Sequence, residues 1–482
     1  MLSRDSLFPL IYFLAVIGLL LSSCGEQDNQ QPNIIFIFAD DQSYNTVRAH
    51  GNHEIQTPNI DRLAEQGTSF THAYNMGGWG GAVCVASRTM LNTGKFVWNA
   101  MTVEPDLDSL AAEGLLWSLL MKQGGYETYF SGKWHVKIDP EKIFDHVSNV
   151  RPGMPGSIPE AYNRPVEGQK DPWSPFDTSL GGFWKGGRHW SEVLGDDAID
   201  YIQQASGKEN PFFMYLAFNA PHDPRQSSEE FVNMYPLENV SVPESFLPEY
   251  PYKNEIGCSP SLRDERLAPF PRTEYAVKVH RQEYYAIISH MDSQIGRILD
   301  ALEESGKAEN TYIFFTADHG LSAGHHGLMG KQNMYDHSIR PPMIVVGPGV
   351  PAGMKRRQDV YLQDIMPTAI ELAGLEIPDY VEFSSLLPTL AGKQDERSYK
   401  AIYACYKDRQ RMIRKNGYKL IVYPYAARVR LYDLENDPLE MIDISEDLER
   451  EELVREMFAD LRELGDQLND TLDLGSFFPG IR

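Results

Sequence analysis

The sequence has few cysteines and a marked deficit of positive charge. Its 482 residues include 4 cysteines, and 44 lysines and arginines against 68 aspartates and glutamates give a net charge of −24. This deficit argues against nucleic acid as a partner, because phosphate backbones are bound by surplus Lys and Arg. An anionic ligand in a locally basic pocket is not excluded, since a few residues decide the charge of a site. The length predicts one large domain and a smaller one.

A short apolar run, from Leu7 to Leu21, stands near the N-terminus. It is shorter than the roughly 20 residues that a membrane-spanning helix needs, and it therefore predicts a secretion signal. The run ends in Leu-Ser-Ser-Cys, which resembles the bacterial lipobox, whose cysteine becomes the lipidated first residue. We expect a lipoprotein signal peptide over residues 1–23, lipidation at Cys24 and a tether over residues 24–31. The chain would then be exported and lipid-anchored to a membrane of the bacterial cell envelope; an ordinary signal peptide cut nearby is the alternative.

The remaining cysteines, Cys84, Cys258 and Cys405, are odd in number. In an oxidising compartment an odd number indicates that one thiol is kept for chemistry. Cys258 and Cys405 could pair, but nothing in the sequence indicates that they do. Cys84 stands in a segment of small residues, with Arg88 four residues later.

Four short apolar runs are each followed by polar residues. They cover residues 34–38, 128–130, 212–218 and 312–315. Uninterrupted apolar strands suit a sheet that is buried on both faces, so we predict an α/β fold with a large, mostly parallel central sheet sandwiched by helices. In such sheets ligands bind outside the carboxyl ends of the strands, where the polar residues would converge.

The pattern changes after about residue 390. Short alternating runs at 418–423 and 430–432 predict a small antiparallel sheet, and a helix with a regular apolar face follows them. We therefore expect a catalytic domain over residues 32–390 and a smaller C-terminal domain of antiparallel sheet plus helix over residues 391–482.

Acidic residues follow the first and the last of the four apolar runs. Asp40 and Asp41 follow the first run, and Asp318 and His319 follow the last. Carboxylates so close repel one another unless a cation lies among them, and a site rich in oxygen ligands suits Ca²⁺ or Mg²⁺. The alternative is that each pair only caps the helix after its strand. Because acidic residues follow two different strands, a shared metal site is favoured over two separate helix caps.

Two lysines and two histidines follow the same runs or lie close after them. They are Lys133, His135, His222 and Lys331. A lone histidine is more often structural than catalytic, but these four would reach one edge of the sheet. Together with a metal ion they describe a pocket for a tetrahedral oxyanion such as sulfate or phosphate.

The segment Cys84-Val85-Ala86-Ser87-Arg88, followed by Thr93-Gly94-Lys95, resembles the sulfatase signature. Four further motifs match the same family in order: Asn33 to Asp41, Gly132 to His135, Ala220 to His222, and Asp318 through Lys331. Five motifs in the right order are highly specific, and they extend over nearly the whole mature chain. The chain is similar to formylglycine-dependent (type I) sulfatases of the alkaline-phosphatase-like superfamily, and among them to bacterial polysaccharide sulfatases that are lipoproteins.

This resemblance implies that Cys84 is oxidised to formylglycine by a formylglycine-generating or an anaerobic sulfatase-maturing enzyme. The hydrated aldehyde would supply the oxygen that attacks sulfur, and a metal would make that oxygen nucleophilic. Arg88 would orient the hydrate. The resemblance also implies one bound Ca²⁺ per chain, with the ligands Asp40, Asp41, Cys84, Asp318 and His319.

The same resemblance assigns roles to the lysines and histidines. Lys133 and Lys331 would neutralise the sulfate oxygens. His222 would donate a proton to the leaving oxygen, with help from Lys331. His135 would take the proton from the second hydroxyl of the sulfated hydrate, which expels sulfate and restores the aldehyde.

The sequence therefore predicts an enzyme that hydrolyses sulfate esters of a polysaccharide or oligosaccharide. A phosphodiesterase or phosphonate monoester hydrolase of the same superfamily is one alternative, and an inactive glycan-binding lipoprotein on the same fold is the other. The complete set of polar residues argues against inactivity. Two positions depart from the family pattern: Ala86 replaces the usual proline, and His319 replaces an asparagine found in many members.

A Gly-rich segment holds aromatic and basic residues close together. Tryptophan faces stack on sugar rings, and an adjacent Lys or Arg can pair with a carboxylate or a second sulfate. The alternative is that the tryptophans pack this loop onto the body of the protein. With a tryptophan shortly before Cys84 and a histidine before Lys331, the predicted sugar contacts are Trp184, Lys185, Arg188, Trp190, Trp79 and His326.

Overall fold

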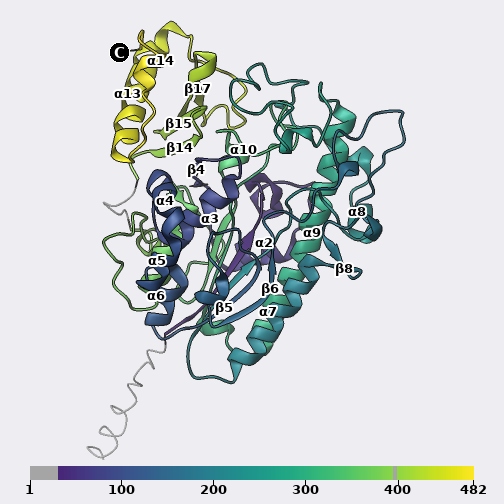
Figure 1. The fold of residues 1–482 in the computed structure, drawn as a ribbon, viewed down its shortest axis with the longest axis vertical. Coiled ribbons are helices and arrows are strands. Elements are labelled where there is room, and N and C mark those ends of the chain that lie inside the picture. Colours follow the sequence, from purple (N-terminus) through teal and green to yellow (C-terminus); the bar gives the residue numbers. More distant parts are fainter. Residues whose placement is uncertain (1–30, 394–398, 482) are drawn as a thin grey trace, which may run out of the picture.

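The computed structural model describes residues 31–393 and 399–481 (Figure 1), so the predicted signal peptide and Cys24 lie outside the described residues. Its centre is an eight-stranded sheet with the strand order β12-β2-β11-β10-β1-β9-β5-β6. Neighbouring strands are parallel except at β11, which is antiparallel to both of its neighbours. The strands are β1 (Asn33–Ala39), β2 (Thr68–Phe70), β5 (Glu127–Lys133), β6 (His146–Arg151), β9 (Phe212–Ala217), β10 (Thr311–Ala317), β11 (Met343–Val346) and β12 (Met354–Arg356).

The side chains of β1 are buried on both faces of this sheet. Ile34, Phe36 and Phe38 belong to the apolar core on one face, and Ile35 and Ile37 to the core on the other. This double burial explains why the run contains no polar residue, and it confirms the predicted α/β fold class. Helices cover the two faces (Figure 1): α3 (Val83–Thr93), α6 (Trp117–Gln123) and α11 (Ile365–Leu372) on the first, and α2 (Pro58–Gln66), α7 (Trp190–Ser206) and α9 (Glu274–Glu304) on the second.

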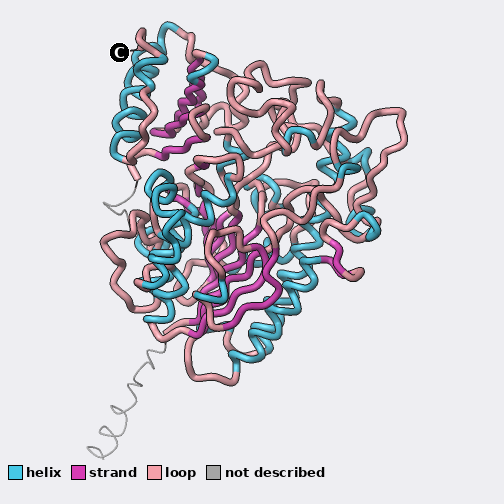
Figure 2. The backbone as a smooth tube through the Cα atoms, viewed as in Figure 1, coloured by secondary structure: helices cyan, strands magenta, loops and turns pink. Residues whose placement is uncertain are grey.

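Short helices and long loops connect these elements, and Figure 2 shows that much of the chain above the central sheet in this view is irregular. The short helices are α4 (Val97–Val103), α5 (Leu107–Ala112), α8 (Glu229–Asn233), α10 (Asp336–Ile339) and α12 (Leu387–Leu390). Two small sheets pair β3 (Ala73–Tyr74) with β13 (Val360–Tyr361), and β7 (Trp184–Lys185) with β8 (Arg188–His189). Among the described residues, no helix is both long and apolar enough to cross a membrane.

A second sheet, of five strands, lies at one end of the molecule (Figure 1). Four of its strands come from the C-terminal part of the chain and are antiparallel in sequence order: β14 (Ile402–Tyr406), β15 (Gln410–Lys415), β16 (Tyr418–Tyr423) and β17 (Arg428–Asp433). Helix α13 (Glu451–Gln467) packs against this sheet, and α14 (Leu474–Phe477) follows it. The predicted C-terminal antiparallel sheet with a helix is thus confirmed.

The fifth strand of this sheet is β4 (Gly77–Gly78), which pairs in parallel with β14. It comes from the segment just before Cys84, and sequence reasoning did not predict it. Gly77 has a φ of 76°, and a Cβ at this position would collide with the carbonyl oxygen of Cys405. The pairing therefore requires glycine. It joins the chain that leads into α3 to the C-terminal sheet, so one strand of that sheet comes from far outside residues 391–482.

The three described cysteines are buried, and none of them forms a disulfide. The Cys258 thiol donates a hydrogen bond to the Gln332 carbonyl over 3.2 Å. Cys405 lies in β14, and Cys84 lies in the first turn of α3. Of the three, Cys84 alone belongs to a group of described side chains that could hold a metal ion.

Candidate active site

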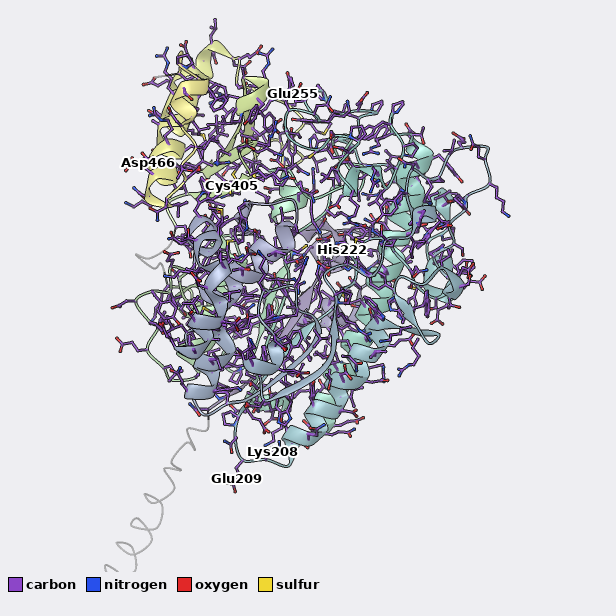
Figure 3. All side chains as sticks on the ribbon, viewed as in Figure 1. Lys208, Glu209, His222, Glu255, Cys405 and Asp466 are labelled. Atoms are coloured by element: carbon purple, nitrogen blue, oxygen red, sulfur yellow. The ribbon has the colours of Figure 1, made fainter. Side chains whose placement is uncertain are left out.

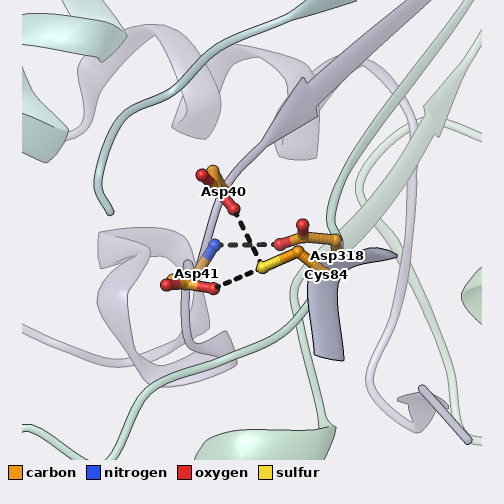
Figure 4. A group of neighbouring side chains, drawn as sticks. All are labelled: Asp40, Asp41, Cys84 and Asp318. Carbon is orange, nitrogen blue, oxygen red and sulfur yellow. Dashed lines mark hydrogen bonds between the residues drawn. The ribbon is translucent and has the colours of Figure 1, made fainter. Parts of the chain in front are cut away.

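Three carboxylates and the Cys84 thiol meet at the carboxyl end of the central sheet (Figure 4). Asp40 and Asp41 directly follow β1, and Asp318 directly follows the adjacent parallel strand β10. The Cys84 Sγ lies 3.5 Å from Asp40 Oδ1 and 3.8 Å from Asp41 Oδ1. All four side chains are buried. The structure therefore brings together the two strand ends that the sequence predicted to meet.

The backbone of Asp41 adopts the left-handed conformation, with a φ of 71°. Its N–H donates to Asp318 Oδ1 over 3.1 Å, and the Tyr284 hydroxyl of α9 donates to the Asp41 carbonyl over 2.6 Å. A non-glycine residue in this region costs about 1 kcal/mol or more, so the surrounding contacts must impose the turn. The turn directs the Asp40 and Asp41 carboxylates toward Cys84.

Arg88 connects three parts of the site from the buried face of α3. Its Nε donates to Asp318 Oδ2 over 3.0 Å, and its Nη1 donates to the Lys133 carbonyl over 2.7 Å. The guanidinium also lies over the Phe38 ring, 4.6 Å from the ring centroid. Burial alone would lower the pKa of Arg88, but Asp318 and Asp40 raise it, so the side chain is always charged.

Two buried lysines complete the charge pattern. The Lys133 ammonium donates to Asp40. The Lys331 ammonium donates to Asp41 Oδ1 over 2.6 Å and lies 3.1 Å from the Cys84 Sγ. Each of the two lysines thus neutralises one of the neighbouring aspartates, and Lys331 also faces the thiol.

Burial and neighbouring charges shift the carboxyl pKa values in opposite directions. Burial raises the pKa of Asp41 to about 6. Burial, followed by the charge of Asp318, raises the pKa of Asp40 well above its usual value. Burial alone would also raise the pKa of Asp318, but Arg88 and Lys133 lower it far below its usual value. Crowded buried carboxylates of this kind favour the addition of a cation.

The donor set fits a hard divalent cation. Asp40, Asp41, Cys84 and Asp318 each offer one ligand atom, and these atoms lie within 4.8 Å of one another. Carboxylate oxygens are the ligands that Ca²⁺ prefers. Within the described residues His319 is not a member of this group, and burial lowers its pKa to about 4. Its role as a ligand stays a prediction.

His135 lies just after β5 and lines a cavity beside Cys84. Burial, with the charge of Lys133, lowers its pKa to about 3, so the imidazole is neutral at neutral pH. A Cβ at position 153 would collide with this ring, so Gly153 is required for the histidine to fit. Sequence reasoning did not identify Gly153.

His222, labelled in Figure 3, lines the same cavity. Its Nδ1 donates to the Asp223 carbonyl over 2.6 Å, because a carbonyl oxygen can only accept. The unprotonated Nε2 then lies 3.7 Å from Asp41 Oδ2. Burial, with the charge of Lys331, lowers the pKa of His222 well below its usual value, so the ring is neutral and Nε2 carries the lone pair.

The cavity beside the thiol has a volume of about 380 Å³. Its lining includes Cys84, His135, His222 and Lys331. It also includes Met154, Leu262, Arg263 and Asp264. A buried reactive position surrounded by fixed cations and neutral imidazoles can stabilise and transfer a tetrahedral oxyanion.

Sequence reasoning missed Arg263 and Asp264, which line this cavity, and it missed Asn75, which donates to the Asp318 carbonyl over 2.6 Å. No periodic pattern or motif marks these positions in the sequence. They become recognisable through the contacts they make with residues far away along the chain.

The predicted sugar contacts in the Gly-rich segment do not line the cavity. Trp184 and Lys185 form β7, and Arg188 lies in β8. Trp190 is the first residue of α7 rather than part of a loop, and the Arg151 guanidinium lies 4.8 Å from its ring centroid. The packing of Trp190 matches the structural alternative; sugar contacts from this hairpin stay a prediction.

The other two predicted sugar contacts also lie outside the lining of the cavity. Trp79 packs against the apolar core that includes the C-terminal sheet. The His326 ring stacks on Tyr335, with 4.0 Å between ring centroids, and its Nε2 donates to the Glu440 carbonyl over 3.0 Å. Both assignments stay predictions.

A family model described as Sulfatase matches residues 32–375. The chain belongs to the sulfatase family. A second model, described as N-sulphoglucosamine sulphohydrolase, C-terminal, matches residues 324–467 of this sulfatase. The resemblance based on the motifs is thus confirmed, and the protein is a sulfuric ester hydrolase.

Named relatives are similar to this sulfatase over nearly its whole length. A protein named Sulfatase from Formosa agariphila is 29% identical over an alignment 469 positions long, which covers 89% of this chain and 87% of the relative. An N-acetylglucosamine-6-O-sulfatase from Bacteroides thetaiotaomicron is 25% identical over an alignment 539 positions long, which covers 96% of this chain and 92% of the relative.

Solved structures share the fold of this sulfatase. One of them, in complex with its substrate D-glucosamine-2-N,6-O-disulfate, has a TM-score of 0.70 at 25% identity and covers 92% of this chain and 99% of its own. A phosphonate monoester hydrolase of Agrobacterium radiobacter has a TM-score of 0.69 at 21% identity and covers 91% of this chain and 96% of its own. At that identity the second likeness shows the fold alone.

Proposed function

We propose that this sulfatase hydrolyses sulfate esters of a sulfated polysaccharide or oligosaccharide, with a formylglycine made from Cys84 as its nucleophile. The observation that carries the proposal is the position of the Cys84 Sγ, which is 3.5 Å from Asp40 Oδ1, 3.8 Å from Asp41 Oδ1 and 3.1 Å from the Lys331 Nζ. The unmodified thiol would be a poor nucleophile there, since burial raises its pKa well above its usual value. The proposal therefore includes a maturation enzyme, either formylglycine-generating or anaerobic.

The carboxylates of Asp40, Asp41 and Asp318 would hold one Ca²⁺. When bound, the cation supplies Lewis-acid stabilisation of negative charge on a reacting oxygen. The hydrogen bond from Arg88 to Asp318 and that from Lys133 to Asp40 fix the orientation of two of these carboxylates. Such orienting contacts are what a precise metal site needs.

Lys331 is the charged donor that faces residue 84. Burial alone would lower its pKa, but the Asp41 carboxylate raises it well above its usual value, so Lys331 holds its proton at neutral pH. Its ammonium would neutralise a sulfate oxygen and give a proton to the leaving oxygen. His222 would share this step only after Nε2 takes up a proton, since its Nδ1 is engaged by the Asp223 carbonyl.

His135 is suited to the opposite role. Its imidazole is neutral and lines the same cavity, so it can accept a proton. It would take the proton that is released when sulfate departs from residue 84. Lys133, on the same strand end, would neutralise sulfate together with Lys331.

The proposal of a carbohydrate substrate is supported by the comparisons with known proteins. A sulfated sugar is the substrate of one structural neighbour, and the name of one relative specifies a sulfated amino sugar.

We propose export and lipid anchoring through Cys24. Cys24→Ala, expressed in a bacterial host, should then move from the membrane fraction to the soluble fraction, and unchanged fractionation would favour an ordinary cleaved signal.

The sulfatase proposal is tested by its products and by the mass of residue 84. The wild type should hydrolyse an aryl sulfate much faster than the matched aryl monoester of a phosphonate. Cys84→Ala should hydrolyse neither ester. In the active enzyme the peptide with residue 84 should be about 18 Da lighter than the cysteine form, because an aldehyde replaces the thiol. A preference for the phosphonate would favour the phosphonate monoester hydrolase alternative. Full activity with only unmodified Cys84 would rule out the proposed nucleophile.

A further inference from the structure

Lys331, the proton donor of the proposed function, lies in irregular chain between β10 and α10. Its ammonium contacts Asp41 and the Cys84 Sγ, but these contacts hold only the far end of the side chain. A lysine side chain is long and flexible, so its ammonium keeps one position only if the backbone below it is fixed as well. Since no helix or strand includes Lys331, side-chain contacts must fix that backbone.

The side-chain amide of the next residue, Gln332, makes such contacts. Its Oε1 accepts a hydrogen bond from the Lys331 N–H over 3.1 Å. Its Nε2 donates to Asp264 Oδ2 over 2.8 Å and to the Gly81 carbonyl over 3.3 Å. Gln332 is 2% exposed, so water competes little for these hydrogen bonds. One amide thus connects the backbone of Lys331 to two distant segments of the chain.

Both of these segments belong to the lining of the cavity beside Cys84. Gly81 lies two residues before α3, and Cys84 lies in the first turn of that helix. Asp264 is itself fixed, because its Oδ1 pairs with the Arg263 guanidinium at 2.6 Å. The amide therefore joins the backbone that carries the proton donor to the chain that leads into residue 84.

The backbone of Gln332 is held by other groups. Its carbonyl accepts a hydrogen bond from Gln410 Nε2, in β15, over 2.8 Å and another from the Cys258 thiol over 3.2 Å. Both contacts involve the main chain of Gln332, so they do not depend on its side chain. Replacing the amide should therefore loosen Lys331 without unfolding the segment.

We propose that Gln332 is a positioning residue, which holds the Lys331 ammonium where it gives its proton to the leaving oxygen. This inference rests on the proposed function and adds a residue that acts through Lys331. When the bond from sulfur to the leaving oxygen breaks, that oxygen keeps the electron pair and takes the proton from Lys331 Nζ, while sulfur bonds to the oxygen of residue 84. A misplacement of about 1 Å can cost about a hundredfold in rate, so loss of the amide should slow this step.

The test compares phenyl sulfate with 4-nitrophenyl sulfate. Nitrophenolate departs readily without a proton, whereas phenolate depends on one. Gln332→Met keeps the length of the side chain and removes its amide. In this variant kcat/KM should fall at least about tenfold more for phenyl sulfate than for 4-nitrophenyl sulfate, because a general acid contributes about 10²–10⁴-fold. The matched control is Gln203→Met, at an exposed position of α7, which should keep the wild-type ratio of the two values.

A double variant shows whether the amide acts through the ammonium. Lys331→Met removes the proton donor, and it should shift the ratio of the two esters in the same direction as Gln332→Met. Adding Gln332→Met to Lys331→Met should then change the ratio little, since the two residues act as one unit. Two shifts that multiply would show that Gln332 acts independently of Lys331, and they would overturn the proposal.

Gln332 also lines the cavity, so direct contact with the substrate is the competing explanation. Such a contact, like a folding defect, would slow both esters by the same factor. An equal loss on both esters, or no loss on either, overturns the positioning role and leaves the sulfatase proposal standing. If the wild type releases sulfate from neither ester, the proposed function fails and this inference falls with it.

Discussion

Asn75 donates a hydrogen bond from its side-chain amide to the backbone carbonyl of Asp318 over 2.6 Å. The same amide lies 2.6 Å from the Ser87 hydroxyl oxygen, and its carbonyl oxygen accepts from the Gly77 N–H over 2.7 Å. One buried side chain thus connects the strand end that carries Asp318, the helix that carries Cys84, and strand β4 of the C-terminal sheet.

Replacing this amide should damage both activity and stability. Asn75→Ala would leave buried partners unsatisfied, which costs about 1–3 kcal/mol. It would also release the Asp318 backbone, and we expect kcat for an aryl sulfate to fall at least tenfold, as small misplacements in an active site do. The measurements are steady-state kinetics and urea unfolding, with the exposed Asn239→Ala as the matched control. An unchanged kcat in Asn75→Ala would contradict this positioning role.

Removal of the metal should inactivate the enzyme reversibly. After treatment with a chelator, turnover should be lost and then restored by Ca²⁺, and Ca²⁺ at about 100 times its Kd should stabilise the fold by about 2.7 kcal/mol. Asp318→Asn should lower bound calcium and turnover together, because it removes a ligand and the partner of Arg88. The exposed Asp379→Asn is the control. Full activity of a metal-free preparation would exclude the site.

Gly77→Ala should destabilise the protein although it adds a single methyl group. The φ of 76° at Gly77 disfavours alanine, and the added Cβ would meet the Cys405 carbonyl in the paired strand. We expect a loss of at least about 2 kcal/mol, from backbone strain and the broken pairing. The control is Gly80→Ala in the same loop, where a Cβ meets nothing within 4 Å. Equal urea midpoints for the two variants would refute the pairing of β4.

Asp364 should make the stability depend on pH. Its carboxyl accepts hydrogen bonds from the Tyr399 hydroxyl and from the Tyr361 and Ser384 N–H groups, yet burial raises its pKa to about 7. Since the carboxyl pKa in the unfolded chain is about 3.9, the folded protein binds this proton more tightly. The contribution of Asp364 is therefore full below about pH 4 and is lost as the pH rises to about 7.

The experiment is a comparison of unfolding free energies at pH 5 and pH 8. Between these values the wild type should lose about 2 kcal/mol more than Asp364→Asn, which cannot titrate. The exposed Asp379→Asn should follow the wild type. Parallel pH profiles for the wild type and Asp364→Asn would show that the buried carboxyl is ionised at pH 5.

The central sheet and the main chemistry at its edge could be predicted from the pattern of amino acids. Strands buried on both faces must be uninterruptedly apolar, so the run before Asp40 was recognisable without a structure. The carboxyl ends of parallel strands share one edge, which placed Asp40 and Asp318 together before any distance was known. The motif around Cys84 and Arg88 indicated the family because it is local: the two residues are four positions apart in α3 and so lie on the same side of the helix.

The contacts that hold the site, and the residues that surround it, depend on how distant parts of the chain pack together. Asn75 and Gly77 act through partners more than 200 residues away, Asp318 and Cys405, and no local pattern encodes such a pair. Arg263 and Asp264 likewise reach the cavity beside Cys84 only in the folded chain. The tryptophans of the Gly-rich segment show the same limit: Trp184 and Trp190 are near one another in the chain, but they do not line the cavity beside Cys84, and their contacts with sugar stay a prediction.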